Sequence, residues 1–223
     1  MGTLFIVSTP IGNLKDISFR AVEILKSVDI VLAEDTRKTG LLLKHFEIKE
    51  KKLIIFFEAN EESKINQVIE LLESGQTIAL VSSAGTPLIS DPGFKLVRSC
   101  VEKNIKVTPI PGASAVMALL AVAGLPTDKF VYLGFLPKKP GKKEKMLLKA
   151  TQLGMTVVFY ESPFRIIKTL EMLNSFHPGM ELRVVVGREL TKKFEEIIRG
   201  NPNEILEKLK GKKIKGELVV GFR

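Results

Sequence analysis

The stretch that decides the fold covers residues 78–93 and reads IALVSSAGTPLISDPG. Its first four residues, 78–81, are all apolar, which is typical of a strand buried inside a sheet. A long loop rich in glycine, serine and proline follows, and after Pro92 a helical pattern begins with Leu96 and Cys100 on its inner face. A strand that runs through such a loop into a helix is typical of an α/β domain, whose ligands bind beyond the carboxyl ends of the strands.

The same alternation of strands and helices extends along the rest of the chain. The predicted strands cover residues 4–7, 30–33, 53–57, 78–81 and 107–110 in the first half, and 130–136, 157–160, 182–186 and 218–222 in the second. Helices are predicted between them, among them 113–122, 164–173 and 202–209. This pattern predicts a largely parallel sheet in the first half. Two prolines and a glycine at 109–112 interrupt it, so we predict two α/β domains, residues 1–111 and 112–223.

The composition limits the classes of protein to consider. The chain has 223 residues, a formal net charge of +9 and one cysteine, Cys100, so no intrachain disulfide is possible. No apolar run approaches the roughly 20 residues that cross a bilayer, and the first strand lacks the basic lead of a signal peptide. We therefore expect a cytoplasmic protein with no membrane segment. The excess of Lys and Arg favours a polyanionic partner, above all nucleic acid.

Four turns that follow predicted strands are candidates for ligand binding: residues 8–14, 34–37, 82–93 and 111–115. Any one of them could serve turn geometry alone, but four in succession favour a ligand site. Their small apolar residues suit a flat ligand better than a triphosphate, and the sequence has no P-loop, dinucleotide fingerprint or G-x-S-x-G elbow. His45, at an exposed helix end, and His177, in a turn, lack the spacing of metal ligands, so we expect no metal.

Charged clusters follow two strands of the second half, at residues 161–165 and 188–192. Each cluster places an arginine near a glutamate, which is consistent with a local ion pair or with a group that binds phosphate. Six lysines lie within residues 138–149 and five more within 208–215, so the second half is distinctly basic. A solvated helix face explains such a run, and an RNA-facing surface is consistent with it.

Several motifs, taken in order, resemble one known family. They are TPIGNL at residues 9–14, AEDTR at 33–37, AGTPLISDPG at 84–93, PGASA at 111–115, GLPTDKF at 124–130, FYESPFR at 159–165, VGRELTK at 186–192 and KGE at 215–217. Together they resemble the RsmI group of ribosomal RNA small-subunit 2′-O-methyltransferases within the tetrapyrrole methylase superfamily. The resemblance covers residues 2–221.

The resemblance implies a fold, a cofactor and a substrate. The fold is that of the class III methyltransferases, with two α/β domains and a cofactor cleft between them, and the methyl donor is S-adenosylmethionine. The acceptor it implies is a cytidine ribose 2′-hydroxyl in the decoding region of 16S ribosomal RNA, within the small ribosomal subunit. The resemblance also implies a homodimer.

Carried over by motif, the resemblance also implies the binding residues. The cofactor-binding residues would be Pro10, Gly85, Thr86, Pro87, Ile89, Ser114, Ala115, Tyr160, Leu190, Gly216 and Glu217. Tyr160 and Leu190 would hold the adenine between them, although ordinary core positions explain each of them nearly as well. Arg165, Arg188 and Lys192 would contact the RNA substrate.

Two positions depart from the family's pattern. The family usually reads SDAGTP, and here Ser83 replaces the aspartate. The segment that carries a histidine in the family is residues 57–61, FEANE, without one. A role that depends on that histidine is therefore absent, while Ser83 offers a hydroxyl that can donate or accept a hydrogen bond.

Methyl transfer to a hydroxyl depends on alignment of the reacting atoms and benefits from a base that removes the hydroxyl proton. Glu34, Asp35, Glu161 and Glu189 are candidate bases by their chemistry and by their places at strand ends. We expect Glu34, Asp35 and Arg37 to form the catalytic cluster, although an aspartate that caps a helix explains Asp35 equally well. The sequence does not single out the base.

Two other functions stay open at this point. One is a C-methyltransferase that acts on a tetrapyrrole precursor, against which the lysine-rich second half and the AEDTR and ELTK motifs argue. The other is a non-catalytic RNA-binding or ribosome-assembly protein that keeps the fold, an alternative that the change at Ser83 leaves open. The intact loops TPIGNL, GTP and SDPG favour the methyltransferase over both.

Overall fold

The structure is a computed structural model that describes residues 1–176 and 182–223. His177, which the sequence places in a turn, lies outside the described residues. The chain divides into two compact units, Met1–Ser114 and Ala115–Arg223. Within the described residues, each unit contains one five-stranded sheet.

The first unit alternates strands with helices along its length. Its elements are β1 (Thr3–Val7), the 3-10 turn η1 (Leu14–Asp16), α1 (Phe19–Ser27), β2 (Ile30–Ala33), α2 (Thr36–His45), β3 (Lys52–Ile55), α3 (Glu61–Glu73), β4 (Ile78–Val81), α4 (Phe94–Glu102) and β5 (Lys106–Ile110). The strand order is β3-β2-β4-β1-β5, and every neighbouring pair is parallel. The prediction of a largely parallel sheet is confirmed, and all the strands end at the same edge of the sheet.

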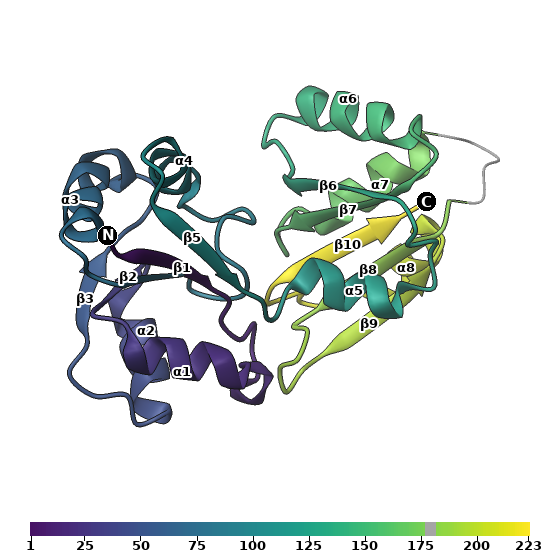
Figure 1. Cartoon of the computed structure of the whole chain (residues 1–223). Coiled ribbons are helices and arrows are strands. Elements are labelled where there is room, and N and C mark those ends of the chain that lie inside the picture. Colours follow the sequence, from purple (N-terminus) through teal and green to yellow (C-terminus); the bar gives the residue numbers. More distant parts are fainter. Residues whose placement is uncertain (177–181) are drawn as a thin grey trace. The chain divides into compact units, whose positions relative to one another are not determined.

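Helices cover both faces of the first sheet (Figure 1). α3 and α4 pack on one face through residues such as Leu72 and Leu96, and α1 and α2 pack on the other through Leu25 and Leu43. Because both faces are covered, β2 and β4 are buried at every position. Their continuous apolar runs are the reason why both strands have the predicted bounds.

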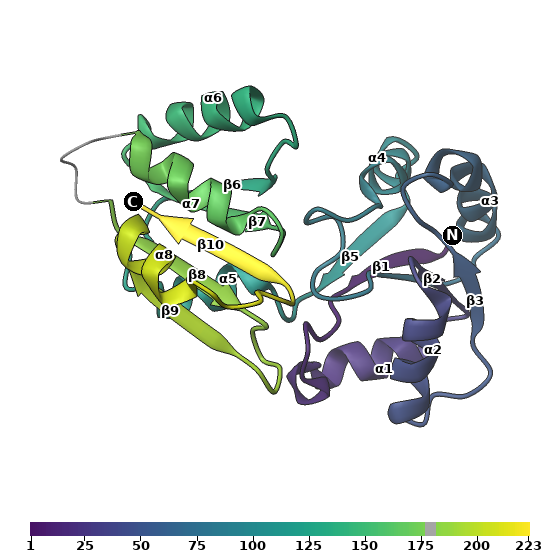
Figure 2. The same cartoon turned by 180° about the vertical axis from the view of Figure 1, so that it is seen from behind.

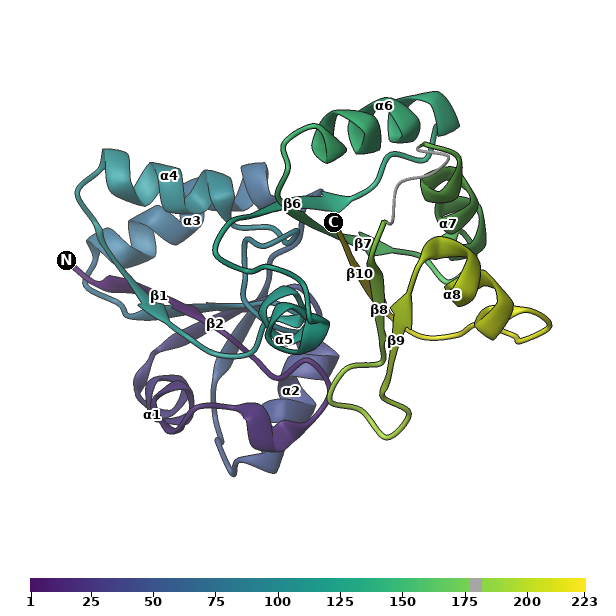
Figure 3. The same ribbon diagram turned by 90° about the vertical axis from the view of Figure 1, so that its right-hand side faces the viewer.

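The second unit holds a mixed sheet. Its elements are α5 (Ala115–Ala123), β6 (Phe130–Phe135), α6 (Pro140–Thr151), β7 (Thr156–Glu161), α7 (Ile166–Ser175), β8 (Val184–Arg188), β9 (Glu196–Gly200), α8 (Pro202–Leu209) and β10 (Leu218–Phe222). The strand order is β6-β7-β10-β8-β9, in which β6 and β7 are parallel and the other pairs are antiparallel. α6, α7 and α8 cover one face and α5 covers the other (Figures 2 and 3). α5 approaches its sheet closely at Gly187, where a Cβ would lie 2.8 Å from Leu119.

The differences from the predicted elements have local causes. β3 ends before Phe57, whose N–H binds the side chain of Asn60 in a turn. β9 is missing from the predicted strands because its two apolar residues lie between charged ones.

Among the helices of residues 1–176 and 182–223, none is both long enough and apolar enough to cross a membrane.

Candidate functional site at the strand ends

Three loops of the first unit meet at the carboxyl ends of β1, β4 and β5. The N–H of Thr9 donates to the carbonyl of Gly85 at 2.9 Å, and the N–H of Gly85 donates back to the carbonyl of Thr9 at 3.0 Å. The hydroxyl of Ser8 donates to Thr86 Oγ1 at 3.0 Å, and the hydroxyl of Thr86 donates to the carbonyl of Ala113 at 3.1 Å. These contacts bring together three of the four loops that the sequence selects for ligand binding, and the fourth, residues 34–37, reaches the loop after β4 through Glu34.

Two glycines let these loops meet through their backbones. A Cβ at Gly112 would lie 2.8 Å from the Cβ of Ser8, and a Cβ at Gly85 would lie 3.2 Å from the side chain of Ile11. Gly85 also has a φ of +79°, which residues with a side chain rarely adopt. Such backbone-lined turns can present N–H and C=O groups to a ligand.

The loop after β4 has an unusual backbone shape that its neighbours maintain. Leu88 and Ser90 have φ angles of 71° and 69°, a conformation that costs about 1–2 kcal/mol per residue. Glu61, at the start of α3 and 6% exposed, holds the end of the loop. Its Oε1 accepts the N–H groups of Gly93 at 3.2 Å and Leu96 at 3.3 Å. Strain of this kind is typical of segments that bind ligands.

Two carboxylates converge on Ser82 and Ser83, the first residues after β4. Glu34, directly after β2, accepts the N–H of Ser83 on Oε2 at 3.2 Å. Asp91, near the end of the loop, is hydrogen-bonded to the side chain of Ser82. Loss of hydration and the negative charge of Glu34 raise the pKa of Asp91 from 3.8 to about 6, against the hydrogen bond from Ser82, which lowers it. Asp91 therefore changes its charge close to neutral pH.

Asp35 and Arg37, which we expect in a catalytic cluster with Glu34, take part in the start of α2. Asp35 Oδ1 accepts the N–H of Arg37 at 2.9 Å and the N–H of Lys38 at 3.3 Å. Arg37 is exposed. The capping role that the sequence offers as the alternative for Asp35 is thus the contact that the structure shows.

A cavity of about 270 Å³ lies beside the two serines. Its lining includes Pro10, Leu14, Lys38, Leu41 and Ser83. Pro10, one of the expected cofactor-binding residues, thus shares a cavity with the position at which the family usually has an aspartate.

In the second unit, Glu161 is the centre of a buried network at the end of β7. Its Oε2 accepts Lys143 Nζ at 3.1 Å and the hydroxyl of Thr169 at 2.7 Å, and its Oε1 pairs with Arg165 at 2.6 Å. Glu161 is 2% exposed and Lys143 is 5% exposed. Arg165 also donates to the carbonyl of Leu136 at 3.1 Å. Both carboxylate oxygens of Glu161 thus have partners. Arg165 is paired with this carboxylate inside the second unit.

The ELTK and KGE motifs are joined by a second network. Lys192 Nζ lies 2.9 Å from Glu189 Oε1 and 2.9 Å from Glu217 Oε2. The N–H of Glu217 also donates to Glu189 Oε1, at 2.9 Å. This backbone hydrogen bond is the main cause that lowers the pKa of Glu189, with help from Lys192. Arg188 pairs instead with Glu196, at 3.0 Å.

The loop after β8 holds a polar atom without a partner. Glu189 and Thr191 have φ angles of 50° and 67°. Among the described residues, Thr191 Oγ1 is a buried side-chain oxygen that has no hydrogen-bond partner. A Cβ at Gly216 would lie 2.5 Å from Glu189, so the adjacent chain also has no room for a side chain there. A strained loop with an unsatisfied hydroxyl is typical of a segment that a ligand completes.

The remaining expected cofactor residues lie in loops, or in a strand or helix next to one. Tyr160, near the end of β7, is half-buried, and its ring is 5.5 Å from that of Tyr132 and 5.2 Å from that of Phe135. Leu190, after β8, is 7% exposed. In the first unit Ile89 is 43% exposed. The other positions are Pro87 in the first unit, Ser114 at its end and Ala115 at the start of the second unit.

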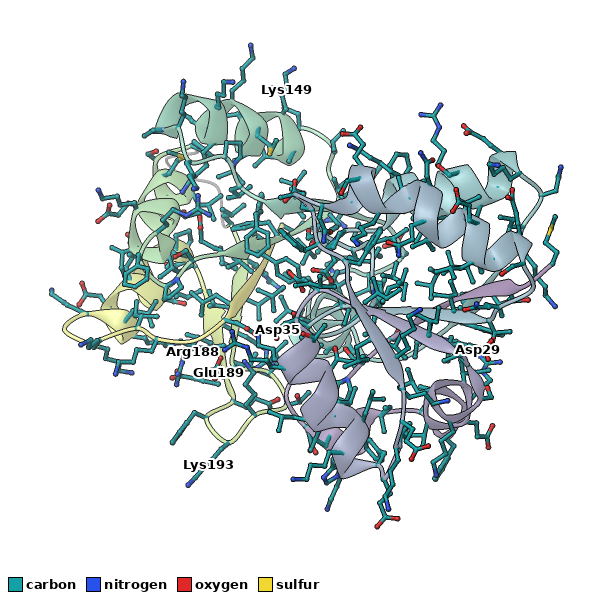
Figure 4. The ribbon with its side chains drawn as sticks, turned by 90° about the vertical axis from the view of Figure 1, so that its left-hand side faces the viewer. Asp29, Asp35, Lys149, Arg188, Glu189 and Lys193 are labelled. Atoms are coloured by element: carbon teal, nitrogen blue, oxygen red, sulfur yellow. The ribbon has the colours of Figure 1, made fainter. Side chains whose placement is uncertain are left out.

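The lysine-rich segment forms α6, and one of its lysines differs from the rest. Lys138, Lys139, Lys142, Lys145 and Lys149 are exposed, whereas Lys143 is buried against Glu161. Figure 4 shows Lys149 extending outward from α6, and Lys193 doing so from the loop after β8. In the described part of the chain, no three His, Cys, Asp or Glu side chains are arranged to hold a metal ion.

Sequence reasoning did not select Asp91, Glu61 or Lys143. Asp91 carries the same signal that selected Glu34, namely a carboxylate in a loop after a strand. Lys143 shares a helix face with Leu147 and Ala150, and this apolar period is the signal of its burial.

Comparisons with known proteins agree with this architecture. The family described as Tetrapyrrole (Corrin/Porphyrin) Methylases matches residues 3–206. Among solved structures, cobalt precorrin-4 methyltransferase superposes with a TM-score of 0.71 at 17% identity, over 98% of this chain and 94% of that one. Uroporphyrin-III C-methyltransferase from Thermus thermophilus, complexed with S-adenyl homocysteine, superposes with a TM-score of 0.66 at 14% identity, over 99% and 97%. The chain belongs to the tetrapyrrole methylase family and has its fold.

Curated relatives place it within one branch of that family. It is 44% identical over 218 residues to ribosomal RNA small subunit methyltransferase I of Hydrogenobaculum sp. (strain Y04AAS1), over 97% of this chain and 94% of the relative. It is 48% identical over 219 residues to the protein of the same name from Streptococcus pyogenes serotype M3, over 98% of this chain and 75% of that one. The branch is therefore that of the ribosomal RNA small subunit methyltransferase I proteins, as the motifs predict.

Proposed function

We propose that this protein transfers the methyl group of S-adenosylmethionine to the 2′-hydroxyl of a cytidine ribose in the decoding region of 16S ribosomal RNA. The observation that carries the proposal is the 44% and 48% identity, over nearly the whole chain, to proteins named ribosomal RNA small subunit methyltransferase I. The nucleotide and the ribose position rest on the motif resemblance. The assembled small subunit is the proposed substrate, and a homodimer is the proposed form of the enzyme.

The strand-end loops have the chemistry that the donor needs. The proposed contacts in the first unit come from Pro10, Gly85, Thr86, Pro87, Ile89 and Ser114, and those in the second from Ala115, Tyr160, Leu190, Gly216 and Glu217. Hydroxyls, backbone groups and apolar side chains fit a nucleoside joined to an amino acid. The unsatisfied hydroxyl of Thr191, next to Leu190, supports a ligand at that loop. When bound, the donor supplies a sulfonium methyl group that is open to attack by an oxygen.

The basic groups of the second unit are proposed to hold the RNA backbone. Arg165, Arg188 and Lys192 each already have a carboxylate partner, so a phosphate would have to share or displace it. The exposed lysines of α6, in contrast, point into solvent, where a phosphate can reach them. We therefore expect α6 to contribute most of the dependence of RNA binding on salt concentration.

A C-methyltransferase that acts on a tetrapyrrole precursor is the second candidate, favoured by the fold shared with uroporphyrin-III C-methyltransferase. Both candidates are tested by offering the protein labelled S-adenosylmethionine with either unmethylated small subunits or uroporphyrinogen III. Label in the RNA alone supports the proposal. Label in the tetrapyrrole alone supports the second candidate, and donor binding without transfer to either acceptor contradicts both.

A further inference from the structure

The carboxylates that sequence reasoning offers as bases differ in their freedom to accept a proton. Asp35 is engaged at the start of α2 by two backbone N–H groups. Glu161 is enclosed by Lys143, Arg165 and Thr169. Glu189 is bound by Lys192 and by a backbone N–H, and its pKa is lowered, mainly by that N–H. Glu189 with its lowered pKa is a weak base, and Oδ1 of Asp35 and both oxygens of Glu161 are already occupied by hydrogen-bond donors.

Asp91 has the opposite surroundings. Its loop is fixed at both ends, by the paired backbones of Thr9 and Gly85 before it and by the hydrogen bond that the N–H of Gly93 donates to Glu61 after it. Its hydrogen bond to Ser82 orients the carboxyl group toward the end of β4, where Glu34 holds the next residue. Asp91 is thus a positioned, partly buried carboxyl group, as a general base needs to be.

We infer that Asp91 is the general base of the methyl transfer and that Glu34 is a positioning residue that keeps Asp91 ready to accept the proton. The inference rests on the proposed function. In the step, the ribose 2′-oxygen forms a bond to the methyl carbon while the bond between that carbon and sulfur breaks. The bonding pair goes to sulfur, which becomes a neutral thioether, and the hydroxyl proton goes to the carboxylate of Asp91. Charge and atoms balance without any further reactant.

The charges around Asp91 support this role. Burial is the main cause that raises the pKa of Asp91 to about 6, and the negative charge of Glu34 adds to it. Glu61 accepts the backbone N–H of Gly93, and Lys95, in the first turn of α4, pairs with Glu62 at 3.1 Å. With this pKa, Asp91 is mostly ionised at neutral pH and still basic enough to take a proton in the transition state.

The titration of Asp91 can be followed without any reaction. The chain has only five aspartates, Asp16, Asp29, Asp35, Asp91 and Asp128, so carbon-13 labelling of aspartate carboxyls gives five signals by NMR. We expect one signal to titrate near pH 6, to be absent in Asp91→Asn and to move to lower pH in Glu34→Gln. A full set of signals that titrate below pH 5 would overturn the inference.

Methyl transfer then tests the role of the base. The kcat/KM of the wild type should fall on the acid side with a midpoint near pH 6, and Glu34→Gln should move that midpoint to lower pH. Asp91→Asn should reduce kcat by about 100-fold or more, the usual contribution of a general base, while its Kd for S-adenosylhomocysteine stays within about 3-fold of the wild type. Asp29→Asn is the control, because Asp29 and Asp35 lie at opposite ends of β2 (Figure 4) and Asp29 should keep the wild-type profile.

The outcomes separate the two claims. If the wild type methylates small subunits and Asp91→Asn keeps more than a tenth of its kcat, Asp91 is not the general base. The proposed function then still stands. A wild type that binds S-adenosylhomocysteine and methylates no small subunit overturns the proposed function, and the role of the base with it. A rate loss in Asp91→Asn together with an unchanged acid midpoint in Glu34→Gln overturns the positioning role of Glu34.

Discussion

Glu34 Oε2 and the backbone nitrogen of Ser83 are 3.2 Å apart, and this hydrogen bond ties the AEDTR motif after β2 to the loop after β4. The two segments are distant in the sequence and are adjacent only because β2 and β4 pair in the parallel sheet. Ser82, the residue before Ser83, is hydrogen-bonded through its side chain to Asp91. The first unit thus gathers two carboxylates and two serines at one strand end.

Asp91→Asn should make the protein more stable at neutral pH. The folded-state pKa of Asp91 is raised from 3.8 to about 6, so the folded protein holds a proton that the unfolded chain has lost, and stability falls as pH rises from about 4 to about 6. An asparagine removes this cost, so the gain at pH 7.5 should be on the order of 1 kcal/mol, less than the roughly 3 kcal/mol of an unscreened shift. Urea unfolding at pH 7.5 and pH 4 measures it, and an equal gain at both pH values would contradict the assignment.

Lys143→Met should destabilise the second unit, because it leaves the buried carboxylate of Glu161 without one of its cations. Breaking a buried ion pair costs about 3–5 kcal/mol, and the contacts that Glu161 keeps with Arg165 and Thr169 place the expected loss near the lower end. Urea unfolding gives the free energy. Lys142→Met, at an exposed position of the same helix, is the matched control and should change it by less than about 0.5 kcal/mol. Equal losses of unfolding free energy in the two variants would show that the ion pair between Lys143 and Glu161 does not stabilise the second unit.

Gly112→Ala should weaken binding of the reaction product S-adenosylhomocysteine. The new Cβ would lie 2.8 Å from the Cβ of Ser8, so the loops after β1 and β5 must separate. We expect the Kd, measured by calorimetry, to rise by about 10-fold or more, which corresponds to about 1.4 kcal/mol. Gly141→Ala places a methyl group in open space on α6 and should leave the Kd unchanged. An unchanged Kd in Gly112→Ala would remove this loop from the donor site.

Exchange of Lys142, Lys145 and Lys149 for glutamine should weaken RNA binding and reduce its dependence on salt. Each phosphate contact that is lost lowers the slope of log K against log salt by about 0.7–0.9. Binding of a small-subunit RNA fragment at several salt concentrations measures the slope. The triple exchange of Lys44, Lys49 and Lys52, exposed lysines of the first unit, changes the net charge equally. Equal effects of both triples would mean that net charge alone matters.

The strands of the sheets could be predicted wherever apolar residues run without interruption. β2, β4 and β10 have the predicted bounds because they are buried along their whole length. β9 could not be found, because its apolar run is only two residues long, between Glu196 and Arg199. Element prediction therefore followed uninterrupted apolar runs, and it failed at β9, where charged residues leave none.

The candidate site was predictable in its loops and not in its contacts. The glycine- and proline-rich turns could be read from the sequence, and their meeting follows from parallel strands that end at one edge. Which carboxylate is placed to accept a proton depends on distances that the sequence does not contain. Asp35 and Asp91 look alike as residues after strands, and only the structure shows that the first caps a helix while the second faces Glu34.

Methyl incorporation from labelled S-adenosylmethionine into small ribosomal subunits that lack the modification tests the proposed activity most directly. The product is digested with nuclease to locate the label. The proposal predicts a single 2′-O-methylated cytidine in the decoding region with the wild-type chain. Binding of S-adenosylhomocysteine without any label in the small subunit would contradict it.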